Sequence, residues 1–243
     1  MNLENNIIWL EETDSTNKFI KTLVDNNAIK NGTIISAKKQ TDGRGQLSNI
    51  WLSEPNKNLT FSIYLKTNIK ATHQFYISKI IALSIYEFIN SITNDVKIKW
   101  PNDIYIKNKK VAGILIENTI QGEYITKTII GIGVNINQTE FDKLLPNPIS
   151  LKNITNKNYN LKDILAEIDA IIKTKIKLLN NFKTIDKEYN SKLYLLNNKA
   201  YFTDNNSIQF TGTIIGTELD GRIKIKTQNL VKRFGFHEIK YIL

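Results

Sequence analysis

The sequence predicts an α+β fold, in which a mixed, largely antiparallel sheet packs with helices and a small C-terminal β-barrel follows. Between residues 7 and 136, short apolar segments alternate with polar turns, which is typical of strands. Two segments, 77–92 and 161–182, repeat apolar residues every three or four positions and indicate amphipathic helices. After residue 199 only short strand-like segments remain. We therefore expect a larger domain over 1–190 and a small β-barrel domain over 191–243.

The chain opens with a predicted strand at residues 7–10, and a polar cluster follows it. Asp14, Ser15, Thr16 and Asn17 precede apolar residues at helical spacing. A Ser or Thr at this point is a good N-cap, and capping alone would explain the cluster. A helix N-terminus also presents free N–H groups that suit polar ligand atoms. Both interpretations stay open.

A glycine-rich loop follows the next predicted strand, 33–37. Gln40 leads into Gly43-Arg44-Gly45-Gln46, and Trp51 ends the segment. Two glycines around a cation exclude a helix or strand interior and predict a mobile loop. The loop is either an ordinary exposed connection or one that closes over a ligand.

Three predicted strands in the middle of the chain carry the most informative residues. Pro101 ends the strand 96–100, and the strand 104–106 and the apolar run 111–116 follow. That run begins at Lys110 and contains Gly113. A cation at the mouth of a buried strand, beside a position without Cβ, suits a small anionic ligand. The plainer interpretation is a solvated hairpin lysine and a packing glycine.

The predicted strand 124–130 continues into a second glycine pair, Gly131 and Gly133, followed by Asn135. These glycines indicate either a bulge and close sheet packing or a backbone that approaches a ligand, with Asn135 bonded to it. Beyond the helix at 161–182, the expected strands are 200–202, 210–215, 222–225 and 234–239, with a hairpin turn at Asp220-Gly221.

Composition excludes several classes of function. The chain has no cysteine, so it has no disulfide framework, and neither of its two histidines has a second metal-type ligand at suitable spacing for a zinc site. It contains neither a phosphate-binding loop ending in Gly-Lys-Ser/Thr nor a dinucleotide fingerprint. The net charge of +10 is spread along the chain rather than gathered into a basic run. We expect a cytoplasmic protein with no membrane span and no signal peptide.

Four segments, taken together, resemble the motifs of biotin–protein ligases. Lys99-Trp100-Pro101-Asn102-Asp103, with Lys110 and the run 112–117, is similar to the central motif of that family. Residues 14–17 resemble its first motif, 43–51 its adenylate-binding loop, and 131–135 its last ligand-lining strand. The loop departs from the family pattern because Gln46, Ser48 and Asn49 replace an arginine, a glycine and an arginine.

The resemblance implies a short, monofunctional ligase without an N-terminal DNA-binding domain, which joins biotin to a biotin carboxyl carrier protein through biotinyl-5′-adenylate. ATP with Mg²⁺ is the implied cosubstrate, with no metal ligand assigned to the protein; no DNA is bound, and a homodimer is possible. The implied catalytic residues are Lys110 and Arg44. The implied biotin-binding residues are Ser15, Thr16, Asn17, Gln40, Gly43, Arg44, Gly45, Gln46, Lys110 and Gly113. The implied nucleotide-binding residues are Trp51, Asn102, Asp103 and Asn135.

Two alternatives remain. A lipoate–protein ligase shares this kind of fold and an adenylate mechanism, but its arginine-rich motif with tripled glycine is absent here. A basic nucleic-acid-binding protein would agree with the net charge, yet no aromatic and basic RNA motif and no recognition helix is present.

Overall fold

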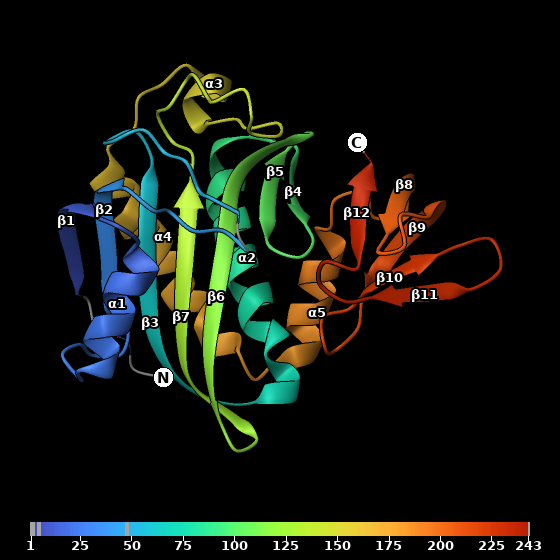
Figure 1. The fold of residues 1–243 in the computed structure, drawn as a ribbon, viewed down its shortest axis with the longest axis horizontal. Helices are drawn as coiled ribbons and strands as arrows, with labels where there is room; N and C mark the ends of the chain where they lie inside the picture. Colours follow the sequence, from blue (N-terminus) through green and yellow to red (C-terminus); the bar gives the residue numbers. More distant parts are fainter. Residues whose placement is uncertain (1–2, 4–5, 47–48, 243) are drawn as a thin grey trace.

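A computed structural model describes residues 3, 6–46 and 49–242, and its larger part is a mixed sheet of seven strands (Figure 1). The strands lie in the order β1-β2-β3-β7-β6-β5-β4. Their bounds are β1 Ile7–Thr13, β2 Ile34–Gln40, β3 Leu59–Lys70, β4 Val96–Lys99, β5 Asp103–Ile106, β6 Lys109–Gln121 and β7 Tyr124–Val134. Only β1 and β2 pair in parallel; every other neighbouring pair is antiparallel. The predicted fold class is confirmed.

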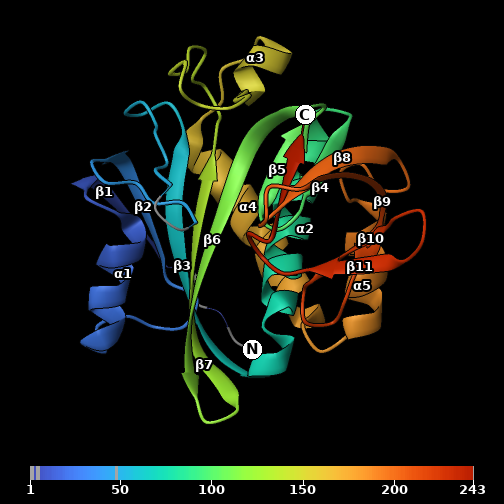
Figure 2. The ribbon, with the colours of Figure 1, turned by 45° about the vertical axis from the view of Figure 1, so that its right-hand side comes forward.

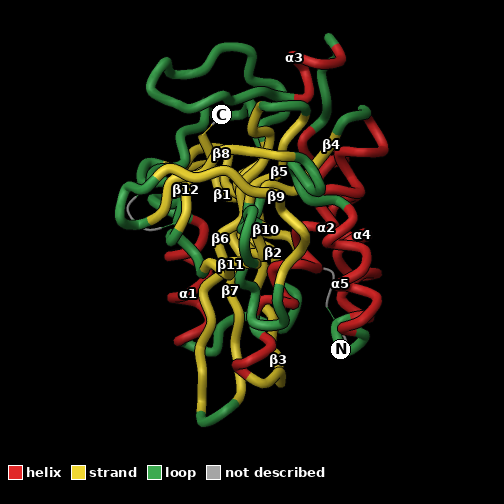
Figure 3. The backbone as a smooth tube through the Cα atoms, turned by 90° about the vertical axis from the view of Figure 1, so that its right-hand side faces the viewer, coloured by secondary structure: helices red, strands yellow, loops and turns green. Residues whose placement is uncertain are grey.

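Helices cover both faces of this sheet (Figure 3). α1 packs on one face against β2, β3 and β7, and α2 and α4 lie on the other. The helices are α1 Thr16–Asp25, α2 Phe75–Ile92, α3 Leu151–Thr155, α4 Leu161–Lys175 and α5 Phe182–Ser191, with single 3₁₀ turns at Ala71–His73 and Ile176–Leu178. The apolar faces of these helices pack against the sheet and are buried there.

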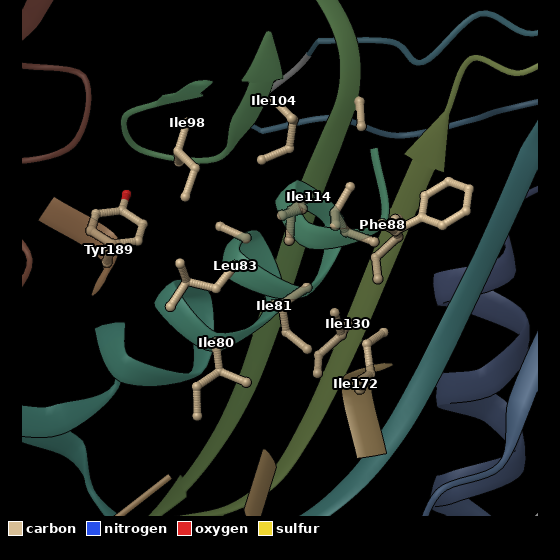
Figure 4. Close-up of a cluster of buried hydrophobic side chains, with 14 of the residues drawn as sticks. Ile80, Ile81, Leu83, Phe88, Ile98, Ile104, Ile114, Ile130, Ile172 and Tyr189 are labelled. Carbon is tan, nitrogen blue, oxygen red and sulfur yellow. The ribbon is translucent and has the colours of Figure 1, made fainter. Parts of the chain in front are cut away.

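The largest core cluster lies between α2 and the sheet (Figure 4). Ile81 and Phe88 of α2 are fully buried beside Ile130 of β7 and Ile172 of α4. Among the described residues, the segment 71–92 is long and apolar enough to cross a membrane by length and composition, but 67% of an 18-residue stretch within it is buried in the protein. This segment, which contains α2, is therefore part of the hydrophobic core.

A second, smaller sheet has five antiparallel strands in the order β11-β10-β9-β8-β12 and stands where the sequence predicts a small β-barrel (Figure 2). Its strands are β8 Lys199–Asp204, β9 Gln209–Thr217, β10 Ile223–Lys226, β11 Val231–Phe234 and β12 Ile239–Ile242. It lies beside β4 and α5, where the indole N–H of Trp100 donates to the carbonyl of Gly221 over 2.8 Å. The division at residues 190 and 191 stays a prediction.

Two predicted elements are wrong in their extent. The helix expected over 161–182 is interrupted: α4 ends in a 3₁₀ turn, and the Asn181 side chain caps α5 by accepting from Thr184 N. The strand expected over 234–239 does not form: β11 ends at Phe234, β12 begins at Ile239, and the residues between them make a turn. His237 has a φ of 67°, and the Glu238 carboxylate accepts from Gly235 N over 2.6 Å. In both places a local side-chain-to-backbone bond overrides the apolar pattern.

Candidate active site

A cavity opens on the α1 face of the larger sheet, under the connection between β2 and β3, which crosses β7 and β6 in Figure 1. The start of α1, this connection and the strands β3, β6 and β7 all contribute to its wall. All but two of the residues that the sequence assigns to the site line it: Ser15, Thr16, Asn17, Gln40, Arg44, Gly45, Gln46, Trp51, Asn102, Asp103, Lys110 and Gly113. The structure therefore brings together segments that lie about a hundred residues apart, such as Ser15 and Gly113.

One end of the cavity, which we call the neutral end, is built from uncharged polar groups at the start of α1. Ser15 holds the N-cap position with extended backbone angles, but its side chain makes no capping hydrogen bond. Ser15, Thr16 and Asn17 are nevertheless almost completely buried. Buried polar groups need hydrogen-bond partners, so helix capping does not account for this cluster.

The neutral end is held by a network that crosses the sheet. The Gln40 side-chain oxygen accepts from the backbone N–H of Thr16 over 2.8 Å. Ser62 Oγ of β3 lies 2.7 Å from Thr16 Oγ1 and 2.6 Å from Asn17 Oδ1, and it is completely buried. Asn17 Nδ2 donates to the Glu117 carboxylate of β6 over 2.6 Å. The side-chain positions at this end are thus fixed without any ligand.

The opposite end, which we call the charged end, centres on an ion pair. Lys110 Nζ lies 2.7 Å from Asp103 Oδ1, with 29% of the lysine side chain and 16% of the aspartate side chain exposed. The Lys110 backbone is fixed by bonds to Asn147 and Ile149. Asn102 holds the preceding turn, since its Nδ2 donates to the carbonyl of Ile114 over 2.8 Å. Lys110 is therefore a half-buried residue of a strand and not a solvated loop lysine.

Trp51 covers the sheet between these ends. An added Cβ on Gly133 would lie 2.3 Å from the indole, and one on Gly113 would lie 3.0 Å from it. Both glycines thus leave room for a ring lying flat on β6 and β7. The indole Nε1 is buried and has no hydrogen-bond partner among the described residues. A buried N–H donor without a protein acceptor indicates that a ligand supplies one.

The glycine-rich loop is closed as a narrow hairpin at its base. Arg44 bridges to Ile50, and Gly45 N donates to Asn49 O over 2.8 Å. The Arg44 side chain is half exposed, with its Nε 3.8 Å from an Asp42 carboxylate oxygen. Gln46 also lines the cavity, whereas Ser48 lies outside the described residues.

A second lysine, Lys99, stands behind the charged end. Lys99 Nζ lies 5.1 Å from the centre of the Tyr105 ring and 4.9 Å from that of Tyr241. Desolvation by burial lowers the pKa of Lys99, and the nearby Asp103 charge partly opposes this effect. No group of three or more His, Asp or Glu side chains that could hold a metal ion occurs among the described residues.

The two remaining predicted site residues lie outside the cavity wall. The Asn135 side chain donates to the carbonyl of Ile149 over 3.0 Å and so fixes a loop. Gly43 allows the chain to pass Trp51, because an added Cβ would lie 2.4 Å from the Trp51 carbonyl oxygen.

Sequence reasoning assigned no role in the site to Ser62 or Glu117, and for Gly131 it left open close sheet packing and an approach of the backbone to a ligand. An added Cβ on Gly131 would lie 2.4 Å from Asn17 Oδ1, so this glycine makes room for the asparagine. The available signal was the alternation in β3, where Thr60 and Ser62 are polar residues that turned out to be buried.

Comparison with known proteins gives a consistent result. Residues 9–135 match the model of the Biotin/lipoate A/B protein ligase family. The bifunctional ligase/repressor BirA of Bacillus spizizenii is 35% identical over 137 residues, which are 56% of this chain and 42% of that protein. The biotin–protein ligase of Homo sapiens is 29% identical over 201 residues, covering 78% of this chain and 27% of the human protein. The chain thus spans less than half the length of these relatives.

A solved structure is similar over nearly the whole chain. The biotin protein ligase of Aquifex aeolicus, in complex with biotin and ATP, superposes with a TM-score of 0.82 at 29% sequence identity. The match covers 98% of this chain and 99% of the Aquifex chain. Both sheets described above are therefore shared with that protein.

Proposed function

Because the chain belongs to the Biotin/lipoate A/B protein ligase family, we propose that it joins biotin to a lysine of a biotin carboxyl carrier protein at the expense of ATP. One observation carries the proposal: a single cavity has a neutral polar end and a charged end, with an indole between them. Biotin is a neutral bicyclic urea with a carboxylate tail. Placed beside ATP, it presents a neutral polar group, then charged groups and an aromatic base, which match the two ends of the cavity and the indole.

In the first step a biotin carboxylate oxygen attacks the α-phosphorus of ATP, and the bond to the β-phosphate oxygen breaks. The products are biotinyl-5′-adenylate and pyrophosphate. Two anions have to approach each other, so the site must neutralise charge in the transition state. Lys110 contacts the carboxylate and the α-phosphate after leaving Asp103, and Arg44 closes over them with its loop.

Mg²⁺ is the metal that accompanies ATP, and the residues present fit it. Mg²⁺ is usually held by one or two carboxylates together with substrate phosphates, and Asp103 is the carboxylate at this end of the cavity. When bound, the ion neutralises phosphate charge. Asn102 helps to position the nucleotide, and Trp51 stacks on the adenine ring.

In the second step the amine of a carrier lysine attacks the activated carbonyl carbon of biotin. An amide bond forms, the bond between the carbonyl carbon and the phosphate oxygen breaks so that AMP leaves, and the amine loses a proton. The cavity holds the acyl group and the leaving group in one orientation, which is a large part of what such a transfer needs. A cytoplasmic location belongs to this proposal.

The proposal is tested by incubating the protein with ATP, apo carrier protein and either biotin or lipoate, each radiolabelled. We expect label on the carrier with biotin only, and pyrophosphate release that requires biotin but not the carrier. Label transferred from lipoate instead would assign the chain to the other branch of its family. Absence of pyrophosphate release with both acids would contradict the proposal.

A further inference from the structure

Lys99 is a half-buried cation to which the proposed mechanism gives no role. It stands on β4 directly opposite Asp103 of β5, at the two ends of the turn that carries Asn102. Lys99 does not line the cavity, and among the described residues its ammonium group makes neither a hydrogen bond nor a direct ion pair. A charge held away from water without a direct partner is costly, so a benefit elsewhere must explain it.

Two aromatic rings hold the ammonium group of Lys99. Its Nζ lies 5.1 Å from the centre of the Tyr105 ring and 4.9 Å from that of Tyr241, which belongs to β12 of the smaller sheet. The face of an aromatic ring attracts a cation, and more strongly where water is excluded. Tyr194 packs against both rings, with centres 5.4 Å and 6.4 Å away, and supports them. Lys99 is therefore a fixed charge.

Asp103 is under the influence of two lysines. Its Oδ1 lies 2.7 Å from Lys110 Nζ. Burial lowers the pKa of Lys99, the charge of Asp103 opposes this effect by favouring the protonated form, and the charge of Lys110 adds to the lowering. Two positive charges thus act on one carboxylate and also repel each other.

Resting on the proposed function, we propose that Lys99 is a positioning residue that weakens the ion pair between Asp103 and Lys110. A fixed cation behind the carboxylate offsets part of its charge and repels Lys110 toward the cavity. Lys110 can then exchange Asp103 for the carboxylate and the α-phosphate of the ligands at a lower cost. Lys99 cannot follow it, because two rings hold Lys99 outside the cavity wall.

This inference gives the smaller sheet a part in the first step of the reaction. Tyr241 reaches Lys99 from β12, and its hydroxyl is buried without a hydrogen-bond partner among the described residues. The ring, rather than the hydroxyl, is therefore what Tyr241 contributes. Tyr241→Phe should keep the rate of pyrophosphate release within about twofold, whereas Tyr241→Leu should slow it by about two- to fivefold.

The main experiment measures pyrophosphate release at saturating biotin and ATP, together with the thermal midpoint of unfolding. We expect Lys99→Met, which keeps an unbranched apolar side chain against the rings, to slow release by about 5- to 20-fold. Its midpoint should stay the same or rise, because the variant removes a charge that is held away from water. Lys99→Arg keeps the charge and can stack on the rings, so it should recover the rate to within about threefold of the wild type.

Lys97→Met is the matched control, because residue 97 lies on the same face of β4, is exposed, and loses the same charge. Its rate should equal that of the wild type. The Asp103→Asn background tests whether Lys99 acts through the carboxylate. No carboxylate then holds Lys110, so adding Lys99→Met should slow single-turnover release of labelled pyrophosphate by less than about twofold.

Four results would overturn the inference and leave the proposed function standing. They are a wild-type rate in Lys99→Met, an equal loss in Lys97→Met, a rate in Lys99→Arg as low as in Lys99→Met, and the full loss persisting in the Asp103→Asn background. A lowered thermal midpoint that accounts for the lost rate would also assign Lys99 a purely structural role. Failure of the wild type to release pyrophosphate with biotin would instead overturn the proposed function.

Discussion

The two ends of the cavity differ in how completely the protein satisfies its own polar groups. At the neutral end, Asn17 and Ser62 are buried and bonded to each other, and Asn17 also donates to Glu117. At the charged end, Lys110 has one ionic partner, Arg44 is half exposed, and the Trp51 indole N–H has no acceptor among the described residues.

This difference follows from the charges of the proposed ligands: the neutral end binds the uncharged urea of biotin, and the charged end binds the phosphates of ATP. A neutral ligand can be recognised by dipoles that are fixed before it arrives, because little desolvation of charge is involved. A triphosphate needs cations, and isolated cations in a half-buried site are costly. The Lys110–Asp103 pair keeps both charges compensated until an anion exchanges with the aspartate. The comparison can be tested at each end separately.

The largest expected effect is at the charged end. Lys110→Ala should slow biotin-dependent pyrophosphate release by roughly 100- to 1000-fold, the usual cost of losing a group that stabilises developing charge. Biotin affinity should fall by a much smaller factor than this rate, because Lys110 contacts only the carboxylate of biotin, and the far-ultraviolet circular dichroism spectrum should be retained. Lys109→Ala, at the exposed neighbouring position, is the control. A wild-type rate in Lys110→Ala would remove this lysine from the mechanism.

At the neutral end, Gly131→Ala should weaken biotin binding by about 10- to 50-fold. The added methyl group would lie 2.4 Å from Asn17 Oδ1, so the asparagine must move and its bonds to Ser62 and Glu117 are strained. Isothermal titration calorimetry measures this directly. An unchanged dissociation constant would show that the position of Asn17 does not matter for biotin.

Gly133→Ala, two residues along the same strand, should weaken the binding of ATP rather than that of biotin. Its added methyl group would lie 2.3 Å from the Trp51 indole, so we expect ATP binding to weaken by about tenfold while biotin affinity changes by less than about threefold. Titrating both ligands into both glycine variants tests the separation of the ends. If both variants lost biotin and ATP equally, the cavity would act as one unit.

The smallest expected effect concerns the loop. Gln46→Arg should slow release of the bound adenylate by roughly 2- to 5-fold, because a charge-assisted hydrogen bond to phosphate is stronger than a neutral one. Trapping the released adenylate over time gives the rate, with Gln46→Lys for comparison. If the variant released the adenylate as fast as the wild type, the neutral amide at position 46 would not weaken adenylate binding.

The strands and most helices could be predicted because their apolar periods are strong. The errors lie where a single side chain redirects the backbone: Asn181 starts a new helix, and Glu238 with His237 at positive φ forms a turn inside a predicted strand. Such bonds leave no trace in hydrophobic periodicity.

The site was predicted where its residues are close in the sequence, as at 14–17, 43–51 and 99–113. Ser62 and Glu117 were given no role there because their partner, Asn17, is 45 and 100 residues away. Only the pairing of β3, β7 and β6 places them around one asparagine. The chemical type of Ser62 is ordinary for a strand, and Glu117 entered the sequence analysis only as the last residue of the run 112–117.

The contact between Trp100 and Gly221 has a consequence for protein engineering. Trp100 immediately precedes the turn that carries Asn102 and Asp103, and its indole N–H is bonded to the smaller sheet. Gly221 has a φ of +93°, and an added Cβ would lie 2.5 Å from the Phe75 ring. A chimera that exchanges residues 191–243 for those of another protein must therefore reproduce this joint, with glycine at position 221, to keep the active-site turn in place.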